Sequence, residues 1–357
     1  MTTPIRPRAT CGEVALRAGV SRTTVSFVLN DLRNKGISEL TRQKVLDAAS
    51  DLGYQPNAAA RTLAGGSTGT IAVVIASADH LLYDAYLPRL LCTINDRCHR
   101  HGYKVLLESA DEQLRRPGAF LDLVRSKSID GLIVANMRTV DGQYVRKLSE
   151  QRFPIVVPGN GIEPFYSRCA SNSDEKSAYV ATKHLVDLGH RRIAHVGFAS
   201  SVFDVVIQRR AGYELALTEG GIAPDAKLVV YGNISAESGY VAMKKLLKRT
   251  RDFSALFAGN DTVAFGAMRA LDEAGLRIPD DVAVVGFDDV PLAAYVNPPL
   301  TTLRTDPIVQ GEGAVDLLMA RINGEPYERI EESYATELVI RRSCGAQAAA
   351  PAKKSVS

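Results

Sequence analysis

Residues 14–30 read VALRAGVSRTTVSFVLN, a stretch with the pattern of two short helices that cross at a turn. Gly19 supplies the turn, because glycine adopts the backbone conformations that a steep crossing requires. Ser21 is suited to cap the second helix by accepting a hydrogen bond from an unpaired amide. Apolar side chains recur on one face of that helix, at Val25, Val28 and Leu29. The stretch therefore predicts a helix-turn-helix, a motif whose second helix fits the major groove of DNA.

The outward face of the second helix is polar except at one position. At about 100° per residue, this face carries Arg22, Thr23, Ser26, Phe27 and Asn30. A third helix is expected to begin near Ser38 or Thr41 and to end at Gly53. The three helices predict an N-terminal all-α DNA-binding head over residues 1–56.

Positive charge is concentrated in this head. Residues 1–67 contain nine Lys/Arg and five Asp/Glu, a net charge of +4. The whole chain has 43 and 40, which leaves 34 and 35 for the rest, a net charge of −1. The excess of positive charge therefore lies in the head, the part of the chain that would contact DNA phosphates. A helical hairpin with a solvated basic face would show the same local pattern.

A short alanine-rich segment follows the head. Asn57 is a good helix N-cap, the alanines favour helix, and Gly65-Gly66 would end it. A helix of this length is not stable alone in water, so it would order only against a partner. A DNA minor groove and a second copy of the segment are suitable partners, with Leu63 as an apolar wedge between base steps. We expect a hinge helix and linker over residues 57–69.

The stretches VALRAGVSRTTVSFVLN and TRQKVLDAASDLGYQPNAAARTLAGG resemble the head and hinge of the lactose-repressor (LacI/GalR) family of bacterial regulators. The resemblance extends to about residue 343. It implies that Arg22 and Thr23 contact base edges and that Thr24 and Asn30 contact phosphates. It also implies that Ala60 and Leu63 lie in the minor groove at the centre of a near-palindromic operator. The expected DNA-binding set is completed by Ser21, Ser26, Phe27, Tyr54 and Asn57.

Two features of the head depart from the family pattern. The family usually carries Arg at the position of Phe27, and Phe cannot read a guanine as Arg does. Phe27 can instead contact a thymine methyl group or pack beside Leu32, and the sequence leaves both possibilities open. The segment Asp31–Ile37 is two residues longer than the usual family loop, which leaves its phosphate contacts open.

From Thr70 onward, apolar runs alternate with amphipathic helical stretches. The runs predict buried parallel strands at Ile71–Ala76, Val105–Leu107, Leu132–Ala135, Ile155–Val157, Ile193–Val196, Leu228–Tyr231, Ala255–Ala258 and Val282–Phe287. Helices are expected at Leu87–His101, Asp174–Leu188, Arg209–Glu219, Glu237–Leu247 and Thr262–Ala274. This alternation predicts doubly wound α/β sheets, and their number predicts two lobes.

The resemblance implies a periplasmic-binding-protein-like core over residues 70–344, with three chain crossings near 168–172, 297–303 and 326–331. Lobe one would comprise about 70–171 and 303–328, and lobe two about 172–300 and 329–344. Ligands of open α/β sheets bind beyond the carboxyl ends of the strands, so two facing lobes predict a cleft between them.

Strand ends supply the candidates for ligand contact. Arg209 matches the family's effector-anchoring arginine, and its guanidinium can hold adjacent hydroxyls or a carboxylate. Asp288 matches a hydroxyl-clamping carboxylate, and Asn260 is expected to line the pocket. Each of the three could instead form a surface salt bridge or cap a strand end.

Other pocket positions depart from a plain sugar site. His80-Leu81-Leu82-Tyr83 stands where many relatives have an Asn-Pro-Phe-Phe-like loop, and Gly159, beside Asn160, stands where relatives often have Asp. Ile234 occupies a place where some relatives stack a tryptophan on the sugar, and this chain has no Trp. The expected effector-binding residues are therefore His80, Tyr83, Gly159, Asn160, Arg209, Ile234, Asn260 and Asp288. Sugar recognition needs an aromatic platform, and only Tyr83 and Phe203 offer one, which suggests that the effector is not a common hexose.

Sequence signals of other protein classes are not found. The chain has no GxGxxG, Walker or GxSxG motif, no CxxC pair among its five cysteines and no apolar run of 18 residues. We expect no catalytic residues, no metal, no cofactor and no membrane association, with reduced thiols in the cytoplasm. Residues 345–357 are expected to be disordered, and they lack the leucine heptads of tetrameric relatives, so we expect a homodimer.

Together these features predict a cytoplasmic, sequence-specific regulator of transcription. We expect a repressor that binds double-stranded operator DNA and responds to a small polar, carbohydrate-like effector in the interlobe cleft. The same parts could serve a co-repressor-dependent regulator or an activator. A solute-binding protein would share the body, but it would need an export signal and no DNA-binding head.

Overall fold

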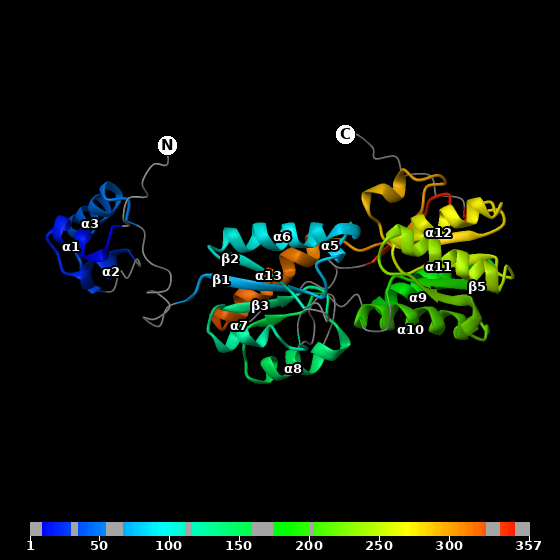
Figure 1. The fold of residues 1–357 in the computed structure, drawn as a ribbon, viewed down its shortest axis with the longest axis horizontal. Helices are drawn as coiled ribbons and strands as arrows, with labels where there is room; N and C mark the ends of the chain where they lie inside the picture. Colours follow the sequence, from blue (N-terminus) through cyan, green and yellow to red (C-terminus); the bar gives the residue numbers. More distant parts are fainter. Residues whose placement is uncertain are drawn as a thin grey trace, which may run out of the picture. The chain divides into compact units, whose positions relative to one another are not determined.

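The computed structural model describes residues 9–29, 35–54, 67–110, 116–158, 174–199, 203–325 and 336–346. The chain divides into two compact units, Met1–Thr68 and Gly69–Ser357 (Figure 1). Among the described residues, no helix is long and apolar enough to cross a membrane.

The first unit is a three-helix head. Its helices are α1 (Cys11–Ala18), α2 (Arg22–Leu29) and α3 (Glu39–Asp51). Thr10 and Glu13 form a capping box at the start of α1, and Gly19 ends that helix in the left-handed conformation with φ 67°. The Ser21 hydroxyl accepts a hydrogen bond of 3.1 Å from the Thr24 amide, which caps α2 as expected. The core of the head consists of small apolar side chains: Val14, Ala15, Val25, Val28, Val45, Ala48 and Ala49.

Lobe one of the second unit contains a parallel sheet of order β2-β1-β3-β4. Its strands are β1 (Thr70–Ile75), β2 (Lys104–Ser109), β3 (Gly131–Val134) and β4 (Ile155–Val156). Helices α6 (Leu87–Arg100) and α13 (Pro307–Asn323) pack on one face against Ile71, Val73 and Ile75. Helices α7 (Leu121–Arg125) and α8 (Gly142–Glu150) pack on the other face against Ala72 and Val74. The short helices α5 (His80–Tyr83) and η2 (Thr139–Asp141) lie in loops that follow strands β1 and β3.

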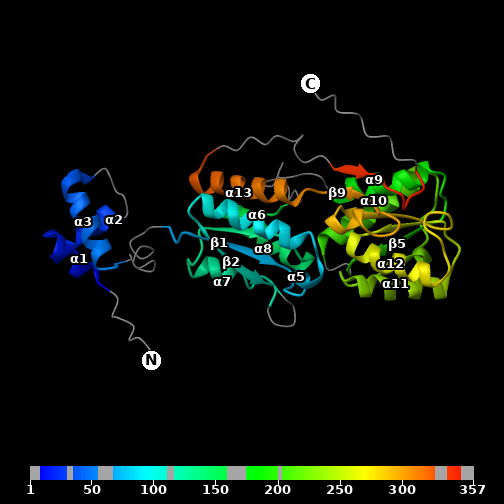
Figure 2. The same ribbon diagram turned by 90° about the horizontal axis from the view of Figure 1, so that it is seen from above.

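Lobe two, drawn mainly in green and yellow in Figure 2, contains a sheet. This sheet has six strands in the order β10-β9-β8-β7-β5-β6. Its strands are β5 (Ile193–Gly197), β6 (Val229–Tyr231), β7 (Ala255–Ala258), β8 (Ala283–Asp288), β9 (Thr301–Arg304) and β10 (Glu337–Val339). Helices α9 (Asp174–Asp187) and α10 (Asp204–Glu219) cover one face, and α11 (Ala236–Arg249) and α12 (Asp261–Glu273) cover the other. The short helices η3 (Ala226–Leu228) and η4 (Pro291–Ala294) precede β6 and follow β8. The predicted fold class is confirmed.

Several details of the expected organisation need correction. Strand β2 is an edge strand whose Leu106 and Leu107 side chains are exposed, so the prediction of a buried strand there was wrong. Strand β9 pairs with β8, so the chain leaves lobe two after Arg304 rather than at 297–303, and residues 301–304 belong to lobe two. The expected crossings at 168–172 and 326–331 lie outside the described residues, as does nearly all of the 345–357 tail.

Candidate functional sites

The exposed side of α2 is the candidate recognition face of the head. Ser21, Arg22, Thr23 and Ser26 are exposed, and Thr24 is half-buried. Arg22 lies over Gly12 of α1, where a Cβ atom would come within 2.9 Å of its Nη2 atom, so the absence of a side chain at Gly12 makes room for the guanidinium. The hydroxyls of Ser21 and Thr24 lie 2.9 Å apart, and both residues are thus engaged at the helix start.

Phe27 and Tyr54 have protein partners in the head. The Phe27 ring is half-buried and has the Lys35 ammonium 5.5 Å from its centroid, a cation–π distance. Tyr54 packs against the core of the head beside Cys11, and burial together with Cys11 raises the pKa of the Tyr54 hydroxyl. Both side chains therefore make contacts within the head itself.

Six predicted site residues lie outside the described residues. They are Asn30, Asn57, Ala60 and Leu63 of the expected DNA interface, and Gly159 and Asn160 of the expected effector site.

A cavity of about 960 Å³ lies between the two lobes. Lobe one contributes the segment after β1, with Asp79, His80 and Tyr83, and lobe two contributes the segment from Tyr231 to Lys245. This volume is at the upper end of the range of ligand pockets, roughly 300–1,000 Å³. Of the predicted effector residues, His80, Tyr83 and Ile234 line this cavity.

Phe203 joins the lobes at the wall of the cavity. Its ring meets the His80 imidazole edge-on, with centroids 5.3 Å apart. The Phe203 backbone pairs with that of Arg138 in an isolated antiparallel bridge. Arg138 is buried and donates to Asp141 from Nε at 2.6 Å and from Nη2 at 3.1 Å. The wall is therefore held in place by contacts from both lobes.

Arg209, Asn260 and Asp288 do not line the cavity; Arg209 and Asp288 lie in a buried polar cluster beside it. Arg209 donates from Nε to Asp174 at 2.6 Å and from Nη1 to the Gly259 carbonyl at 2.5 Å, and its Nη2 lies 3.5 Å from Asp288. The guanidinium also lies 3.6 Å from the centroid of the Phe287 ring. Burial acts against its charged form, yet Asp174 and Asp288 raise the pKa of Arg209. All three guanidinium nitrogens thus have protein partners.

Burial shifts two carboxyl groups at or near this cluster, those of Asp288 and Asp84, toward their neutral forms. Burial raises the pKa of Asp288 well above its usual value; Arg209 opposes the shift, and the carboxylates of Asp84, Asp261 and Asp174 add to it. Burial likewise raises the pKa of Asp84 in lobe one. A neutral Asp288 can donate a hydrogen bond as well as accept one, which suits a ligand hydroxyl.

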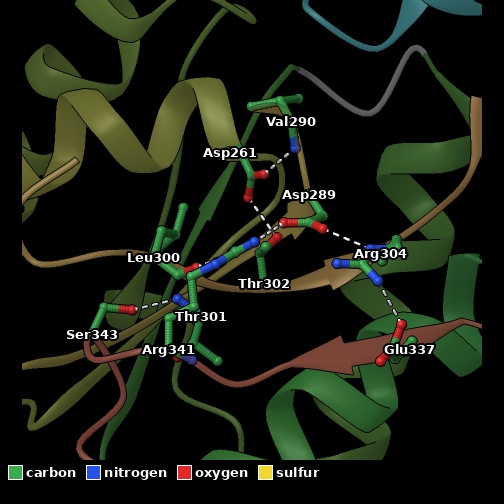
Figure 3. Close-up of polar contacts among 10 residues, drawn as sticks. All are labelled: Asp261, Asp289, Val290, Leu300, Thr301, Thr302, Arg304, Glu337, Arg341 and Ser343. Carbon is green, nitrogen blue, oxygen red and sulfur yellow. Dashed lines mark hydrogen bonds and ion pairs between the residues drawn. The ribbon is translucent and has the colours of Figure 1, made fainter. Parts of the chain in front are cut away.

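Asn260 and Asp261 both form hydrogen bonds that organise this end of lobe two. The Asn260 side chain accepts a hydrogen bond of 2.9 Å from the Val263 amide and so caps the start of helix α12, a role that the sequence analysis did not anticipate. Asp261 accepts hydrogen bonds from the Val290 amide at 2.9 Å and the Thr302 hydroxyl at 2.6 Å (Figure 3). Asp289 accepts from Arg304 at 2.7 Å and from Arg341 at 2.6 Å. These bonds join the ends of β8, β9 and the C-terminal segment.

Unusual backbone conformations gather at this end of lobe two. Ile234, Asp288 and Asp289 have φ values of 59°, 106° and 52°, which cost free energy in residues with side chains. The Ile234 amide donates to the Phe198 carbonyl at 2.5 Å, and the ring of Phe198 lies 5.1 Å from the Arg209 guanidinium. Phe198 thus connects the cavity with the polar cluster.

Sequence reasoning missed several residues of the cleft. Tyr231, Glu237 and Lys245 line the cavity, and Asp84 and Asp174 act electrostatically on the polar cluster. The aromatic platform is therefore larger than expected, because Tyr231 and His80 join Tyr83 and Phe203. A signal was present at Tyr231, the last residue of a predicted strand, where ligand contacts are expected.

Comparison with known proteins agrees with this arrangement. A model of the lacI family of bacterial regulatory proteins matches residues 10–57, and a periplasmic binding protein-like domain matches residues 182–344. The HTH-type transcriptional repressor PurR of Mannheimia succiniciproducens is 34% identical over 94% of this chain and 98% of that protein. PurR of Photobacterium profundum is 31% identical over 94% of this chain and 98% of that protein.

Two solved structures of similar proteins contain a ligand. The lac repressor dimer bound to operator and the anti-inducer ONPF has 29% identity and a TM-score of 0.74, over 95% of this chain and 100% of that one. The complex of the transcriptional regulator CelR with cellobiose has 30% identity and a TM-score of 0.66, over 94% of this chain and 100% of that one.

A helix-turn-helix head and a two-lobed ligand-binding body define a DNA-binding regulator of transcription. The chain belongs to the lacI family of bacterial regulatory proteins.

Proposed function

We propose that this regulator is a cytoplasmic repressor that binds a near-palindromic operator as a homodimer and is controlled by a small polar effector between its lobes. The observation that carries the proposal is the cavity of about 960 Å³ lined from both lobes, in a chain whose head exposes Arg22, Thr23 and Ser26 on one helix. The relatives named PurR are transcriptional repressors, which supports repression rather than activation by this chain.

The roles of the site residues are part of the proposal. Arg22 and Thr23 read base edges, while Ser21, Thr24 and Asn30 position the head on phosphates. His80, Tyr83 and Ile234 contact the effector directly. Arg209 and Asp288 hold the cavity wall through Phe198 and meet the effector where it reaches the polar cluster. The proposal includes no catalytic step.

Effector control requires that the ligand bind one arrangement of the lobes more tightly than another, since only differential affinity shifts a conformational balance. Phe203 supplies a contact between the lobes that depends on their spacing. A ligand that fills the cavity beside Phe203 would favour the arrangement in which this contact is made. The hinge segment 57–69 then carries the change toward the head.

A second copy of the chain supplies the partner head. The support is the exposed edge of lobe one, where Leu106 and Leu107 are 36% and 45% exposed, and the exposed Tyr295 of lobe two at 83%. Exposed apolar side chains of this size favour association, and an edge strand such as β2 also has one side open to pairing with another chain. The similar lac repressor structure is a dimer on its operator, which suits this proposal.

Selection of bound sequences from random duplex DNA tests the proposal. The full-length protein should enrich a palindromic motif, and its affinity should fall steeply with salt because phosphate contacts release counterions. Adding sugars to the same binding assay tests effector control. A loss of enrichment in both Arg22→Ala and Thr23→Ala, with the head still folded, would support the DNA-binding face. Enrichment of no motif by the wild-type protein would overturn the proposed function.

A further inference from the structure

The cavity between the lobes continues along helix α11. Glu237, Val241 and Lys245 all line it, and their spacing of four residues places them in one row on the helix. We call this row the α11 stripe. At 1.5 Å per residue it runs about 12 Å, which is longer than a single sugar ring.

Two charged side chains of the α11 stripe are free to bind a ligand. Among the residues that the structure describes, neither the Glu237 carboxylate nor the Lys245 ammonium has a hydrogen bond or ion pair. Lys244, the neighbour of Lys245 on the same helix, instead contacts Tyr240 at 2.9 Å and Glu273 at 3.8 Å. Val241 between the two charges is 58% exposed, so an apolar surface separates them.

An aromatic ring borders the α11 stripe. Tyr231 lies directly over Gly197, where a Cβ atom would come within 2.5 Å of its ring, and Tyr231 as a residue is 44% exposed. On the opposite lobe Tyr83 is 52% exposed at the same cavity. An exposed ring beside a carboxylate and an ammonium suits a sugar, whose apolar face packs on the ring while its hydroxyls bind the charged groups.

The charges of the cavity favour a neutral ligand. Its lining carries Asp79, Glu237, Lys245 and Arg138, and Arg138 is bound to Asp141 through two hydrogen bonds. The lining therefore presents no excess of positive charge. A doubly charged phosphate ester would need such an excess.

We propose that the α11 stripe and Tyr231 form a second subsite that binds the outer sugar ring of an oligosaccharide effector. The inner ring lies at the floor formed by His80, Phe203 and Ile234. The proposal rests on the effector control proposed above and specifies its ligand. It makes Glu237 and Lys245 the residues that distinguish an oligosaccharide from its component monosaccharide.

Calorimetric titration of the full-length protein tests the second subsite. The probes are glucose, galactose, mannose and xylose, and the disaccharides cellobiose, lactose, maltose, mannobiose and xylobiose. The tightest ligand should be a disaccharide that binds about tenfold or more tightly than its monosaccharides, since a tenfold ratio equals about 1.4 kcal/mol, the scale of one charged hydrogen bond. Glu237→Gln and Lys245→Met should each remove most of this advantage and leave monosaccharide binding within about twofold.

Matched variants separate the subsite from general effects. Lys248→Met changes an exposed lysine of α11 outside the cavity lining and should leave every titration unchanged. Tyr231→Phe keeps the ring and should bind the disaccharide like wild type, whereas Tyr231→Ala should weaken it. These substitutions lie at exposed positions, and thermal unfolding confirms that each variant is folded.

Failure of the second subsite and failure of the proposed function would give different experimental results. A monosaccharide as the tightest ligand, or an equal loss of mono- and disaccharide binding in the variants, would overturn the second subsite and leave operator binding intact. Binding of none of the sugars would overturn both the subsite and the sugar-like effector, while motif selection still tests the DNA-binding role by itself.

Discussion

Phe203 of lobe two lies edge-on to His80 of lobe one, with ring centroids 5.3 Å apart, and both residues line the interlobe cavity. An aromatic contact of this kind depends on the spacing of the lobes. The same two rings would be covered by a bound effector. We therefore expect this pair of side chains to couple ligand binding to the spacing of the lobes.

Removing the Phe203 ring should loosen the lobes. In Phe203→Ala, small-angle X-ray scattering should show a larger radius of gyration than in wild type, and sugars should bind more weakly. Operator binding should persist but lose its response to the effector. Phe203→Tyr retains the ring and serves as the control; a normal effector response in Phe203→Ala would rule out the coupling.

Arg209 should be important for stability as well as for response. Arg209→Ala leaves the largely buried Asp174 without its partner cation, and removal of one partner from a buried pair costs about 3–5 kcal/mol. Urea denaturation should show this loss. The milder Arg209→Lys keeps the positive charge but cannot bind all three partners of the guanidinium at once. It should therefore fold but respond poorly to the effector. Wild-type stability of Arg209→Ala would show that the ion pairs of Arg209 do not stabilise the fold.

Asp261 should make folding stability depend on pH. Burial raises the pKa of Asp261 to about 7, although hydrogen bonds from Thr302 and Val290 act to lower it. The unfolded chain releases this proton near pH 4, whereas the folded protein keeps it until about pH 7. The free energy of unfolding should therefore fall as pH rises from about 4 to 7, because the folded state binds the extra proton.

Asp261→Asn removes this ionisation and should flatten that part of the pH dependence, measured by chemical denaturation from pH 4 to 8. Asp272→Asn, at an exposed position of α12, is the control and should keep the wild-type slope. Identical slopes in wild type and Asp261→Asn would show that Asp261 is ionised throughout.

Base preference should depend on α2. Thr23→Ala should change the preferred base at one or two positions of each half-site, at a cost of about 1–3 kcal/mol per lost base contact. Phe27→Arg introduces a group that reads guanine and should raise the preference for guanine at a single position. Sequencing of selected duplexes measures both effects. An unchanged motif in both variants would mean that α2 is not the reading helix.

The exposed edge of lobe one should be required for dimerisation. Leu107→Lys places a charge on β2 and should shift the protein toward monomers in sedimentation velocity, with a parallel loss of operator affinity. Leu188→Lys changes a leucine of similar exposure, 41%, near the end of α9 and is the control. A fully dimeric Leu107→Lys would place the interface elsewhere.

The predictable parts of the fold are those specified by local signals. Gly19, Ser21 and Ser38 start or end helices through bonds to their near neighbours, and these positions were predicted from the sequence. Strands β9 and β10 were not predicted, because the short segments Thr301–Arg304 and Glu337–Val339 become strands only by pairing with distant partners. The exposure of Leu107 follows from the place of β2 in the sheet order, which its apolar run does not encode.

The site could be predicted only in part, because many of the partners of its residues come from distant parts of the chain. Arg209 and Asp288 do lie together, as strand-end reasoning and the family resemblance implied, but the sequence could not show that Asp174 and Gly259 would bind the rest of the guanidinium. Asn260 was ambiguous because its side chain can cap a helix or bind a ligand with the same oxygen. Glu237 and Lys245 look in the sequence like an ordinary solvated helix face, and only the folded chain shows that they line the cavity between the lobes.

Helix α13 separates β9 from β10 in the chain, although both strands belong to lobe two and the helix packs on lobe one. No single cut in the gene can therefore release either lobe as a contiguous fragment. Expression trials with truncated coding regions should yield insoluble lobe two unless a linker bridges Arg304 to Glu337 and omits the helix. Evolution by duplication or exchange of one lobe would face the same obstacle. Exchange of the whole two-lobed unit, with the DNA-binding head retained, is therefore the easier route to a new effector.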